Sequence, residues 1–241
     1  MSLWYADRGP WHSYLASANQ TLFWSPSDTR ERWDQHQKNS VTKKKLDELG
    51  WREDSISYSF NHQGFRDDQF DDRPSGLAIG CSFTQGTGLA RDQLWVTGLS
   101  RNLGIHIWNL GIGGASMDTC SRILEHYLPI LKPKFVVLCT PPKERFEYLD
   151  GEFHIFNALN KHNATWFPKV WFLHDENSRL QFEKNLAWMK QMAQDQSVPF
   201  FYFHHKTLFV DADARDLAHP GPRGHAYAVT KLQPQIERIL T

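Results

Sequence analysis

GLAIGCSFTQGTG, residues 76–88, is the stretch of sequence that decides the fold. Its first five residues are apolar or small, and they run directly into Cys81, Ser82 and a glycine-rich turn. A short continuous apolar run bounded by a turn predicts a strand that is buried on both faces of a parallel sheet. Ser82 therefore stands at the carboxyl end of a strand, the edge where open parallel sheets bind ligands.

Further apolar runs of strand length follow along the chain, at residues 105–110, 135–139 and 199–203. Amphipathic stretches of helix length separate or follow them, at residues 92–103, 117–131, 178–194 and 227–240. This alternation predicts a parallel sheet with helices on both faces. The expected fold class is α/β, a three-layer α/β/α sandwich with a central, mostly parallel sheet.

Residues 1–74 precede this pattern and are polar, with many tryptophans and charges. Within them, TKKKLDELGW at residues 42–51 predicts a helix, and SISYSF at residues 55–60 predicts a short strand. We expect residues 1–74 to form an N-terminal extension packed on a core domain of residues 75–241.

The composition excludes some classes of function. The 27 lysines and arginines balance the 27 aspartates and glutamates, so no net field attracts nucleic acid, and a small neutral substrate fits better. No apolar run is long enough to span a bilayer, and the first residues lack a secretory signal pattern, which predicts a cytoplasmic protein. The three cysteines lack metal-ligand spacing and are expected to be buried apolar residues.

Ser82 has two interpretations. At the end of a strand and the start of a helix, its hydroxyl would lie near backbone N–H groups and the positive end of the helix dipole, which suits attack on a carbonyl carbon. A serine at this position is also a common helix N-cap. This motif alone leaves both interpretations open.

Asp216 precedes His219 by three positions in DLAHPG, residues 216–221. In a turn, this separation lets the carboxylate accept a hydrogen bond from one ring nitrogen and leaves the other nitrogen to take a serine proton. A capping aspartate beside a structural histidine is the alternative interpretation of the motif on its own.

Taken together, GCSFT at residues 80–84, NLGIGGAS at residues 109–116 and DLAHP at residues 216–220 resemble the blocks of the SGNH (GDSL-type) hydrolases, a family of esterases and lipases. FNHQGFR at residues 60–66 resembles a lead-in motif of some members. The resemblance covers residues 75–240 and implies a flavodoxin-like three-layer fold.

The resemblance also implies a function. Ser82, His219 and Asp216 would form a catalytic triad, and the backbone N–H groups of Ser82 and Gly114 would form the oxyanion site. The implied activity is hydrolysis of a carboxylic ester, such as a short acyl ester, an acetylated sugar or a lipid, with no cofactor and no metal.

The chain departs from the family pattern at two blocks. Cys81 stands where the family usually has an aspartate before the nucleophile. After the third strand, Pro141, Pro142 and Lys143 replace the usual Gly-x-Asn-Asp pattern, which removes the side-chain donor of the oxyanion site. Losing one such donor typically lowers turnover by about 10²- to 10³-fold.

Arg145 and Lys143 are the candidate replacement donors and substrate-binding residues, and Arg145 is favoured because a guanidinium presents several N–H groups in one plane. A surface salt bridge with Glu144 or Glu147 is the alternative. The aromatic stretch of residues 150–174 lacks clean periodicity. We expect its residues Trp166 and Trp171 to line or cover the substrate pocket, although core packing explains them equally well.

Other classes of function remain to be weighed. A non-catalytic binding or assembly protein that kept the fold with a degraded oxyanion site is the main alternative. A dinucleotide-binding turn at residues 111–114 is disfavoured because the glycine spacing is incomplete. A metal site is disfavoured because the candidate ligands match no known spacing: His204, His205, Asp211, Asp213, His219 and His225. His225 is expected to begin or cap the last helix.

Overall fold

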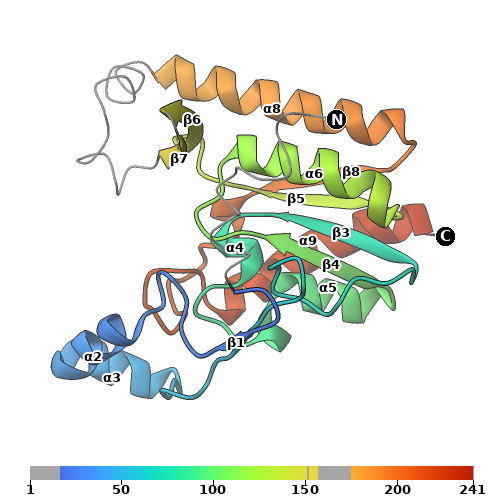
Figure 1. Ribbon diagram of the computed structural model, residues 1–241. Helices are drawn as coiled ribbons and strands as arrows, with labels where there is room; N and C mark the ends of the chain where they lie inside the picture. Colours follow the sequence, from blue (N-terminus) through green and yellow to red (C-terminus); the bar gives the residue numbers. More distant parts are fainter. Residues whose placement is uncertain (1–16, 151, 157–174, 241) are drawn as a thin grey trace.

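Four parallel strands form the centre of the molecule, in a computed structural model that describes residues 17–150, 152–156 and 175–240 (Figure 1). The strands are β3 (Ser75–Gly80), β4 (His106–Gly111), β5 (Val136–Thr140) and β8 (Phe200–His204). Their order in the sheet is β4-β3-β5-β8, and all three pairings are parallel. This is the order of the first four strands of a flavodoxin-like, doubly wound sheet. Each strand lies within one residue of its predicted bounds.

Helices cover both faces of this sheet (Figure 1). On one face lie α6 (Met117–Leu131) and α8 (Asp175–Asp195), which pack against each other. On the other face lie α5 (Trp95–Leu103) and α9 (Pro222–Leu240). The prediction of a three-layer α/β/α sandwich with a parallel sheet is therefore confirmed.

The central strands are buried because their residues are apolar on both faces. Leu77 and Ile79 of β3 and Val137 of β5 are completely buried, as expected for strands that carry helices above and below. The helices contribute their apolar stripes to the same core, where Trp95 and Trp108 are the largest fully buried side chains. Burial of this apolar surface is the main stabilising contribution to the fold.

Several predicted helices differ from the structure at their starts, and two of them show a physical reason. The stretch predicted at residues 92–103 begins with a separate 3₁₀ turn, η1 (Arg91–Gln93), because Leu94 between it and α5 is extended, with a ψ of 145°. The last helix, predicted from residue 227, begins five residues earlier at Pro222, the position where proline is favoured in a helix. The sequence pattern missed this first turn because it is not amphipathic.

The described part of the N-terminal region contains two short helices and a small sheet. Helix α2 (Arg30–Lys38) is followed directly by α3 (Ser40–Glu48), and β1 (Thr21–Leu22) pairs antiparallel with β2 (Tyr58–Ser59). The strand predicted at residues 55–60 is thus shorter than expected. A second apolar cluster joins this region to the core, with Trp33, Trp51 and Tyr58 on one side and Leu89 and Leu94 on the other. The boundary at residue 74 stays a prediction.

Strands β6 (Phe146–Asp150) and β7 (Glu152–Phe156) form an antiparallel hairpin after β5. The prediction of an irregular connection from residue 150 is therefore wrong for residues 152–156, where pairing with β6 organises the chain. The rest of that segment, with Trp166 and Trp171, lies outside the described residues.

The three cysteines are free and buried, as predicted. They belong to different elements: Cys81 follows β3, Cys120 lies in α6 and Cys139 lies in β5. Burial raises the pKa of the Cys120 and Cys139 thiols well above the ordinary value. Among the described residues, no helix combines the length and the apolar character needed to cross a bilayer.

Candidate active site

The turn between β3 and α4 (Ser82–Gln85) presents Ser82 at the carboxyl end of the sheet. The adjacent strand β4 holds this turn closely. A Cβ atom at Gly111 would lie 2.3 Å from the backbone nitrogen of Gln85, so only glycine allows the approach. The side-chain amide of Asn109 donates to the carbonyl of Thr84 at 2.9 Å. The block that follows the second strand therefore fixes the backbone of the serine turn.

Ser82, His219 and Asp216 form a continuous hydrogen-bonded chain. The Oγ atom of Ser82 lies 2.9 Å from Nε2 of His219, and Nδ1 of His219 lies 2.6 Å from Oδ2 of Asp216. Ser82 is 4% exposed and the side chain of Asp216 is fully buried. The fold thus brings together the three residues that the sequence motifs singled out, in the order that proton transfer from a serine requires.

The loop that carries Asp216 and His219 is fixed by the aspartate itself. Its Oδ1 atom accepts hydrogen bonds from the backbone N–H groups of Ala218 and His219, each at 3.0 Å. Leu217, between Asp216 and Ala218, is left-handed, with a φ of 51°, a conformation that costs a residue other than glycine energy. Burial alone would raise the pKa of Asp216, but the hydrogen bonds and charge of His219 together with these two N–H groups hold it below its usual value. The carboxylate therefore stays ionised.

The aromatic ring of Phe83 lies beside the triad histidine. Its centroid is 5.5 Å from that of His219, and it stacks on His205 at 5.5 Å on another side. His205 Nδ1 donates to the carbonyl of Thr140 at 3.0 Å. Burial, followed by the nearby charge of His204, lowers the pKa of His205 to about 4, so its ring is neutral at neutral pH. The sequence analysis considered His205 only as a metal ligand; its place at the end of β8 was the signal that it faces this edge.

Gly114, the predicted oxyanion glycine, has a φ of 80°. A Cβ atom at this position would meet nothing within 4 Å, so glycine is favoured by the backbone conformation rather than by close packing. Its neighbour Ala115 donates from its backbone to the carbonyl of Ile112 at 3.1 Å. The turn after β4 is thus a tight, glycine-dependent turn.

Lys143 and Arg145, the candidate replacement donors, lie in different surroundings. The Nζ atom of Lys143 pairs with Oδ2 of Asp175, at the start of α8, at 2.8 Å, and both side chains are exposed. The Nη1 atom of Arg145 donates to the carbonyl of Ala115 at 3.5 Å, beside Gly114. Only Arg145 is therefore shown next to the predicted oxyanion turn.

Glu147, one of the two residues considered as partners in an alternative surface salt bridge, is instead a buried anchor of β6. Its carboxylate lies 2.5 Å from Nη2 of Arg122 and accepts from Oγ1 of Thr119 at 2.5 Å. Its backbone N–H donates to Asp118 at 3.0 Å. These contacts tie the chain that follows the altered third block to the first turn of α6.

Several residues of metal-ligand type are bound by other groups of the protein. His225 Nδ1 accepts from the backbone N–H of Trp95, the first residue of α5, at 3.0 Å inside the core. The prediction that His225 begins or caps the last helix is therefore wrong, because α9 begins three residues earlier at Pro222. Among the described residues, the three metal-ligand types that come within 4.8 Å of one another are Asp67, Asp68 and His106. Arg91 pairs with both of those carboxylates, so protein donors already neutralise them.

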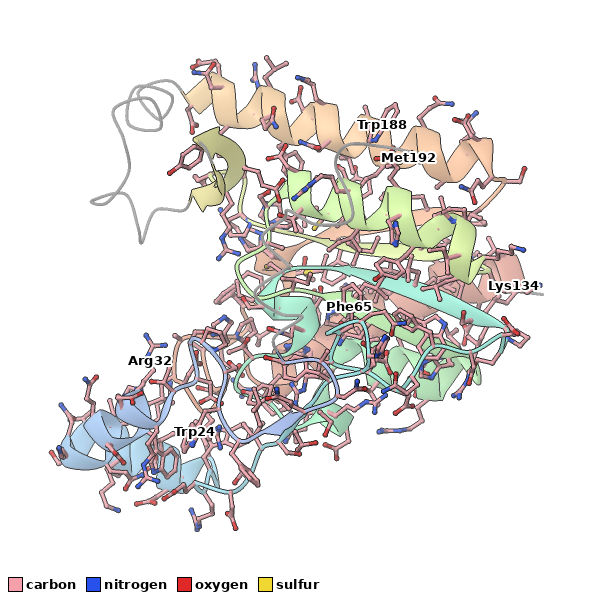
Figure 2. The ribbon with its side chains drawn as sticks, in the orientation of Figure 1. Trp24, Arg32, Phe65, Lys134, Trp188 and Met192 are labelled. Atoms are coloured by element: carbon pink, nitrogen blue, oxygen red, sulfur yellow. The ribbon has the colours of Figure 1, made fainter. Side chains whose placement is uncertain are left out.

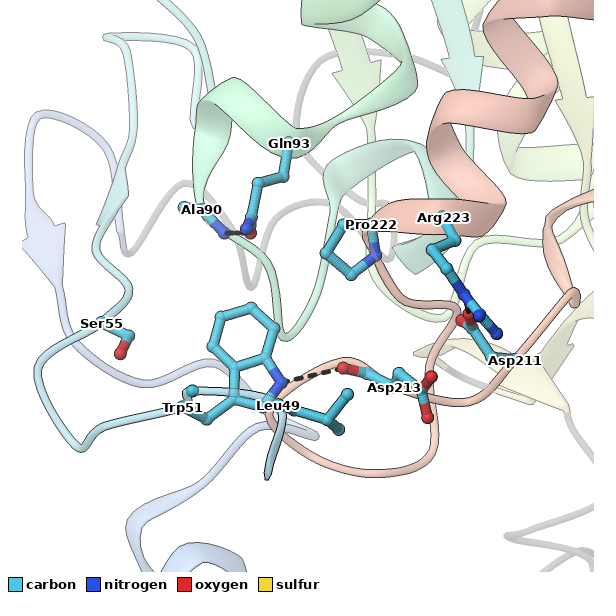
Figure 3. Close-up of a pocket in the computed structure, with 10 residues that line it drawn as sticks. Leu49, Trp51, Ser55, Ala90, Gln93, Asp211, Asp213, Pro222 and Arg223 are labelled. Atoms are coloured by element: carbon cyan, nitrogen blue, oxygen red, sulfur yellow. Dashed lines mark hydrogen bonds and ion pairs between the residues drawn. The ribbon is translucent and has the colours of Figure 1, made fainter. Parts of the chain in front are cut away.

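The cavity in Figure 3 lies beside the loop of residues 211–223, not on the triad. It has a volume of about 490 Å³ and is lined by Trp51, Gln93, Asp213, Pro222 and Arg223 among others. The indole N–H of Trp51 donates to the carbonyl of Asp213 at 2.8 Å (Figure 3). The N-terminal region therefore braces the loop that carries the triad acid and histidine.

Sequence analysis missed the basic residues that connect the N-terminal region to the site. Arg66 donates to the carbonyls of Gly86 at 2.6 Å and Leu89 at 2.8 Å, in the turn after the serine helix. Arg215 forms a fully buried ion pair with Asp28 at 2.6 Å. The role of Arg66 could have been detected, because this residue stands in the lead-in motif. The pair of Arg215 and Asp28 could not, because the two residues are 187 positions apart in the sequence.

No protein-family model and no curated protein matches the chain. Solved structures that it resembles include TesA, at a TM-score of 0.47 and 15% identity over 68% of this chain and 99% of that one. The psychrotrophic esterase EstA from Pseudoalteromonas sp. has a TM-score of 0.40 and 14% identity over 70% of this chain and 99% of that one. A member of the lipolytic protein G-D-S-L family from Veillonella parvula has a TM-score of 0.38 and 15% identity over 66% of this chain and 96% of that one. Because these identities and scores are low, the assignment of chemistry depends on the geometry of the site.

Proposed function

We propose that the protein is a serine hydrolase that acts on carboxylic esters, with Ser82 as nucleophile, His219 as general base and Asp216 as the group that orients the imidazole. One observation carries the proposal: Ser82 Oγ lies 2.9 Å from His219 Nε2, while His219 Nδ1 lies 2.6 Å from Asp216 Oδ2. Both distances are within the range that a serine hydrolase uses to pass a proton.

In the first half of the reaction, Ser82 Oγ attacks the ester carbonyl carbon while its proton moves to Nε2 of His219. The tetrahedral intermediate then collapses, the bond to the alcohol oxygen breaks, and Nε2 returns the proton to the leaving alcohol. In the second half, water takes the place of the alcohol and the same nitrogen removes its proton, which releases the acid and restores Ser82. Asp216 remains ionised throughout and stabilises the transient imidazolium.

The oxyanion is assigned to the backbone N–H groups of Ser82 and Gly114, with Arg145 as the side-chain donor that replaces the missing amide. Two backbone donors are enough for catalysis in other serine hydrolases. Support for Arg145 is its hydrogen bond to the carbonyl of Ala115, the residue after Gly114. In the proposed reaction, this guanidinium would donate to the negatively charged oxygen.

The proposed substrates are small esters: short acyl esters, acetylated sugars or lipids. The equal numbers of acidic and basic residues favour a neutral substrate over a polyanion. The proposed contribution of Trp166 and Trp171 to the substrate pocket falls outside the described residues and stands as a proposal from sequence.

A non-catalytic binding or assembly protein is the second candidate, and one observation favours it. Pro141 and Pro142 occupy the end of the third strand, where the family supplies a side-chain amide. Proline offers neither a side-chain donor nor a backbone N–H. Such a protein would keep the triad geometry without efficient turnover.

A fluorophosphonate probe separates the two candidates, because it reacts with activated serines. The unmodified protein is expected to be labelled, Ser82→Ala is expected to remain unlabelled, and Ser59→Ala, which removes an exposed hydroxyl in β2, is expected to be labelled normally. Hydrolysis of p-nitrophenyl acetate should increase with pH through the range in which histidine loses its proton. An unmodified protein that neither reacts with the probe nor hydrolyses the ester would support the binding protein instead.

A further inference from the structure

Helix α2, which lies 184 residues from the triad acid along the chain, contacts that acid directly. The Nη1 atom of Arg32 lies 3.4 Å from Oδ2 of Asp216, the same oxygen that accepts from the triad histidine. One turn further along α2, Nε2 of His36 donates to the backbone carbonyl of Asp216 at 3.2 Å. Two side chains of one helix therefore hold the side chain and the backbone of a single residue.

These contacts complete the hydrogen bonding of the carboxylate. Oδ1 of Asp216 accepts two backbone N–H groups of its own loop, and Oδ2 is shared by His219 and Arg32. A fully buried carboxylate is stabilised by a permanent cation nearby. Arg32 supplies that charge from the surface, where its side chain is 41% exposed.

The position of α2 is itself fixed from inside the molecule. Its first turn is capped by Thr29, whose side chain accepts from the backbone N–H of Arg32 at 3.2 Å. The preceding residue, Asp28, forms the buried ion pair with Arg215, the neighbour of the triad acid in sequence. Trp24 and Arg32 lie at one end of the molecule in Figure 2, opposite Trp188 and Met192 of α8. The helix is thus anchored to the same loop that it contacts.

We propose that Arg32 and His36 of α2 are positioning residues of the active site, through which the N-terminal region sets the orientation and the basicity of the triad. The inference rests on the proposed hydrolase function. Because Arg32 competes with His219 for Oδ2, its charge weakens the hold of the carboxylate on a protonated imidazole. Removing the charge makes the imidazole harder to deprotonate, and the enzyme then needs a higher pH to act.

The test compares variants of one helix. Arg32→Gln removes the charge and Arg32→Lys keeps it. The control, Arg30→Gln, removes a half-exposed arginine of the same helix that pairs with Asp34 and Glu53 instead. For Arg32→Gln we expect a roughly 10-fold lower kcat for p-nitrophenyl acetate at neutral pH with little change in KM, since a displaced triad member slows chemistry more than binding. The acid limb of its pH profile should move up by roughly half a pH unit.

Arg32→Lys should keep the acid limb at the wild-type pH, and Arg30→Gln should match wild type in rate and profile. In the described part of the chain, the titratable groups that face the Asp216–His219 pair include Arg32, His36 and His225 of α9. All the variants retain His225, so its effect on the pH profile is the same in each of them. Arg32→Met, which keeps the side-chain stem, replaces Arg32→Gln if that variant melts early. Profiles of the two glutamine variants that superimpose would overturn the proposal.

A measurement without substrate separates this inference from the proposed function. The proton between His219 Nδ1 and Asp216 should give a downfield proton resonance in the NMR spectrum, and it should shift in Arg32→Gln but stay in place in Arg30→Gln. A protein without esterase activity whose resonance shifts in this way would refute the hydrolase and keep the positioning role. An active protein whose resonance is unmoved in both variants would refute the positioning role alone.

Discussion

The two sides of the candidate site are built differently. On the triad side, Ser82, His219 and Asp216 are joined by hydrogen bonds of 2.9 and 2.6 Å. On the oxyanion side, Gly114 keeps its left-handed turn, but the end of β5 has prolines in place of a side-chain amide. Under the proposed function, proton transfer and oxyanion binding would use separate elements, so that one can change while the other stays intact.

The anchoring of the two sides differs as well. The triad loop is held by the N-terminal region, through Arg215 with Asp28 and through Trp51. The chain after β5 is held by the first turns of α6, through Glu147 and Arg122. Substitutions on each side should therefore give effects that are independent of those on the other.

The largest effect is expected from breaking the triad side. Asp216→Asn leaves the shape of the side chain but favours the wrong tautomer of His219, and should lower kcat for ester hydrolysis by about 10⁴-fold. Steady-state kinetics on p-nitrophenyl acetate measures this. Asp71→Asn, a change at an exposed carboxylate paired with Arg73, is the control and should behave as wild type. Activity within 10-fold of wild type in Asp216→Asn would remove the acid from the mechanism.

Breaking the buried ion pair between Arg215 and Asp28, which holds the loop of Asp216 and His219, should affect stability instead. Arg215→Met leaves the carboxylate of Asp28 buried without its cation, and should lower the free energy of unfolding by about 3–5 kcal/mol. Urea unfolding measures the change. Since replacing both partners of a buried pair removes the unpaired charge, Arg215→Met combined with Asp28→Leu should recover most of the loss. A double variant no more stable than the single one would contradict this account.

On the oxyanion side, the comparison is sharpened by the two cationic side chains. Arg145→Ala should lower kcat by about 10²-fold if its guanidinium replaces the missing amide donor. Lys143→Ala, which removes an exposed ion pair with Asp175, should leave kcat and stability nearly unchanged. Equal rates for the two variants would leave the backbone N–H groups as the whole oxyanion site.

The smallest expected effect is a dependence of stability on pH that comes from His225, which is buried in the core. Burial lowers the pKa of His225 to about 3, so the unfolded chain binds a proton there more readily than the folded protein does. Stability from this group is complete above the ordinary histidine value near ~6.5 and is lost as pH falls from there towards 3. Urea unfolding at pH 5 should give a lower free energy than at pH 7, by about 2 kcal/mol from His225 alone, in addition to the loss from His205, whose pKa burial also lowers. Equal values at the two pH values would show that His225 is not held neutral.

A feature of the fold or of the candidate site could be predicted when the residues that form it are close together in the sequence. The strands β3 and β5 were predicted within one residue because their burial on both faces makes each a continuous apolar run. Ser82 and the Asp216–His219 pair were found because short motifs carry them, one at the end of β3 and the other in the loop before α9. The hairpin β6–β7 was missed since pairing between strands, rather than composition, forms it. Arg32 and Arg215 were missed because their partners are 184 and 187 residues away.

The three buried cysteines can be used to measure how often the core of the protein opens. Cys81, Cys120 and Cys139 lie in three separate elements and have no exposed surface. A thiol-alkylating reagent can modify them only when the surrounding layers part, so the rate of alkylation measures how often the core opens. A phosphonate probe on the triad serine measures the intact site in the same sample, and the two labels together would distinguish a variant that has lost its chemistry from one that has lost its fold.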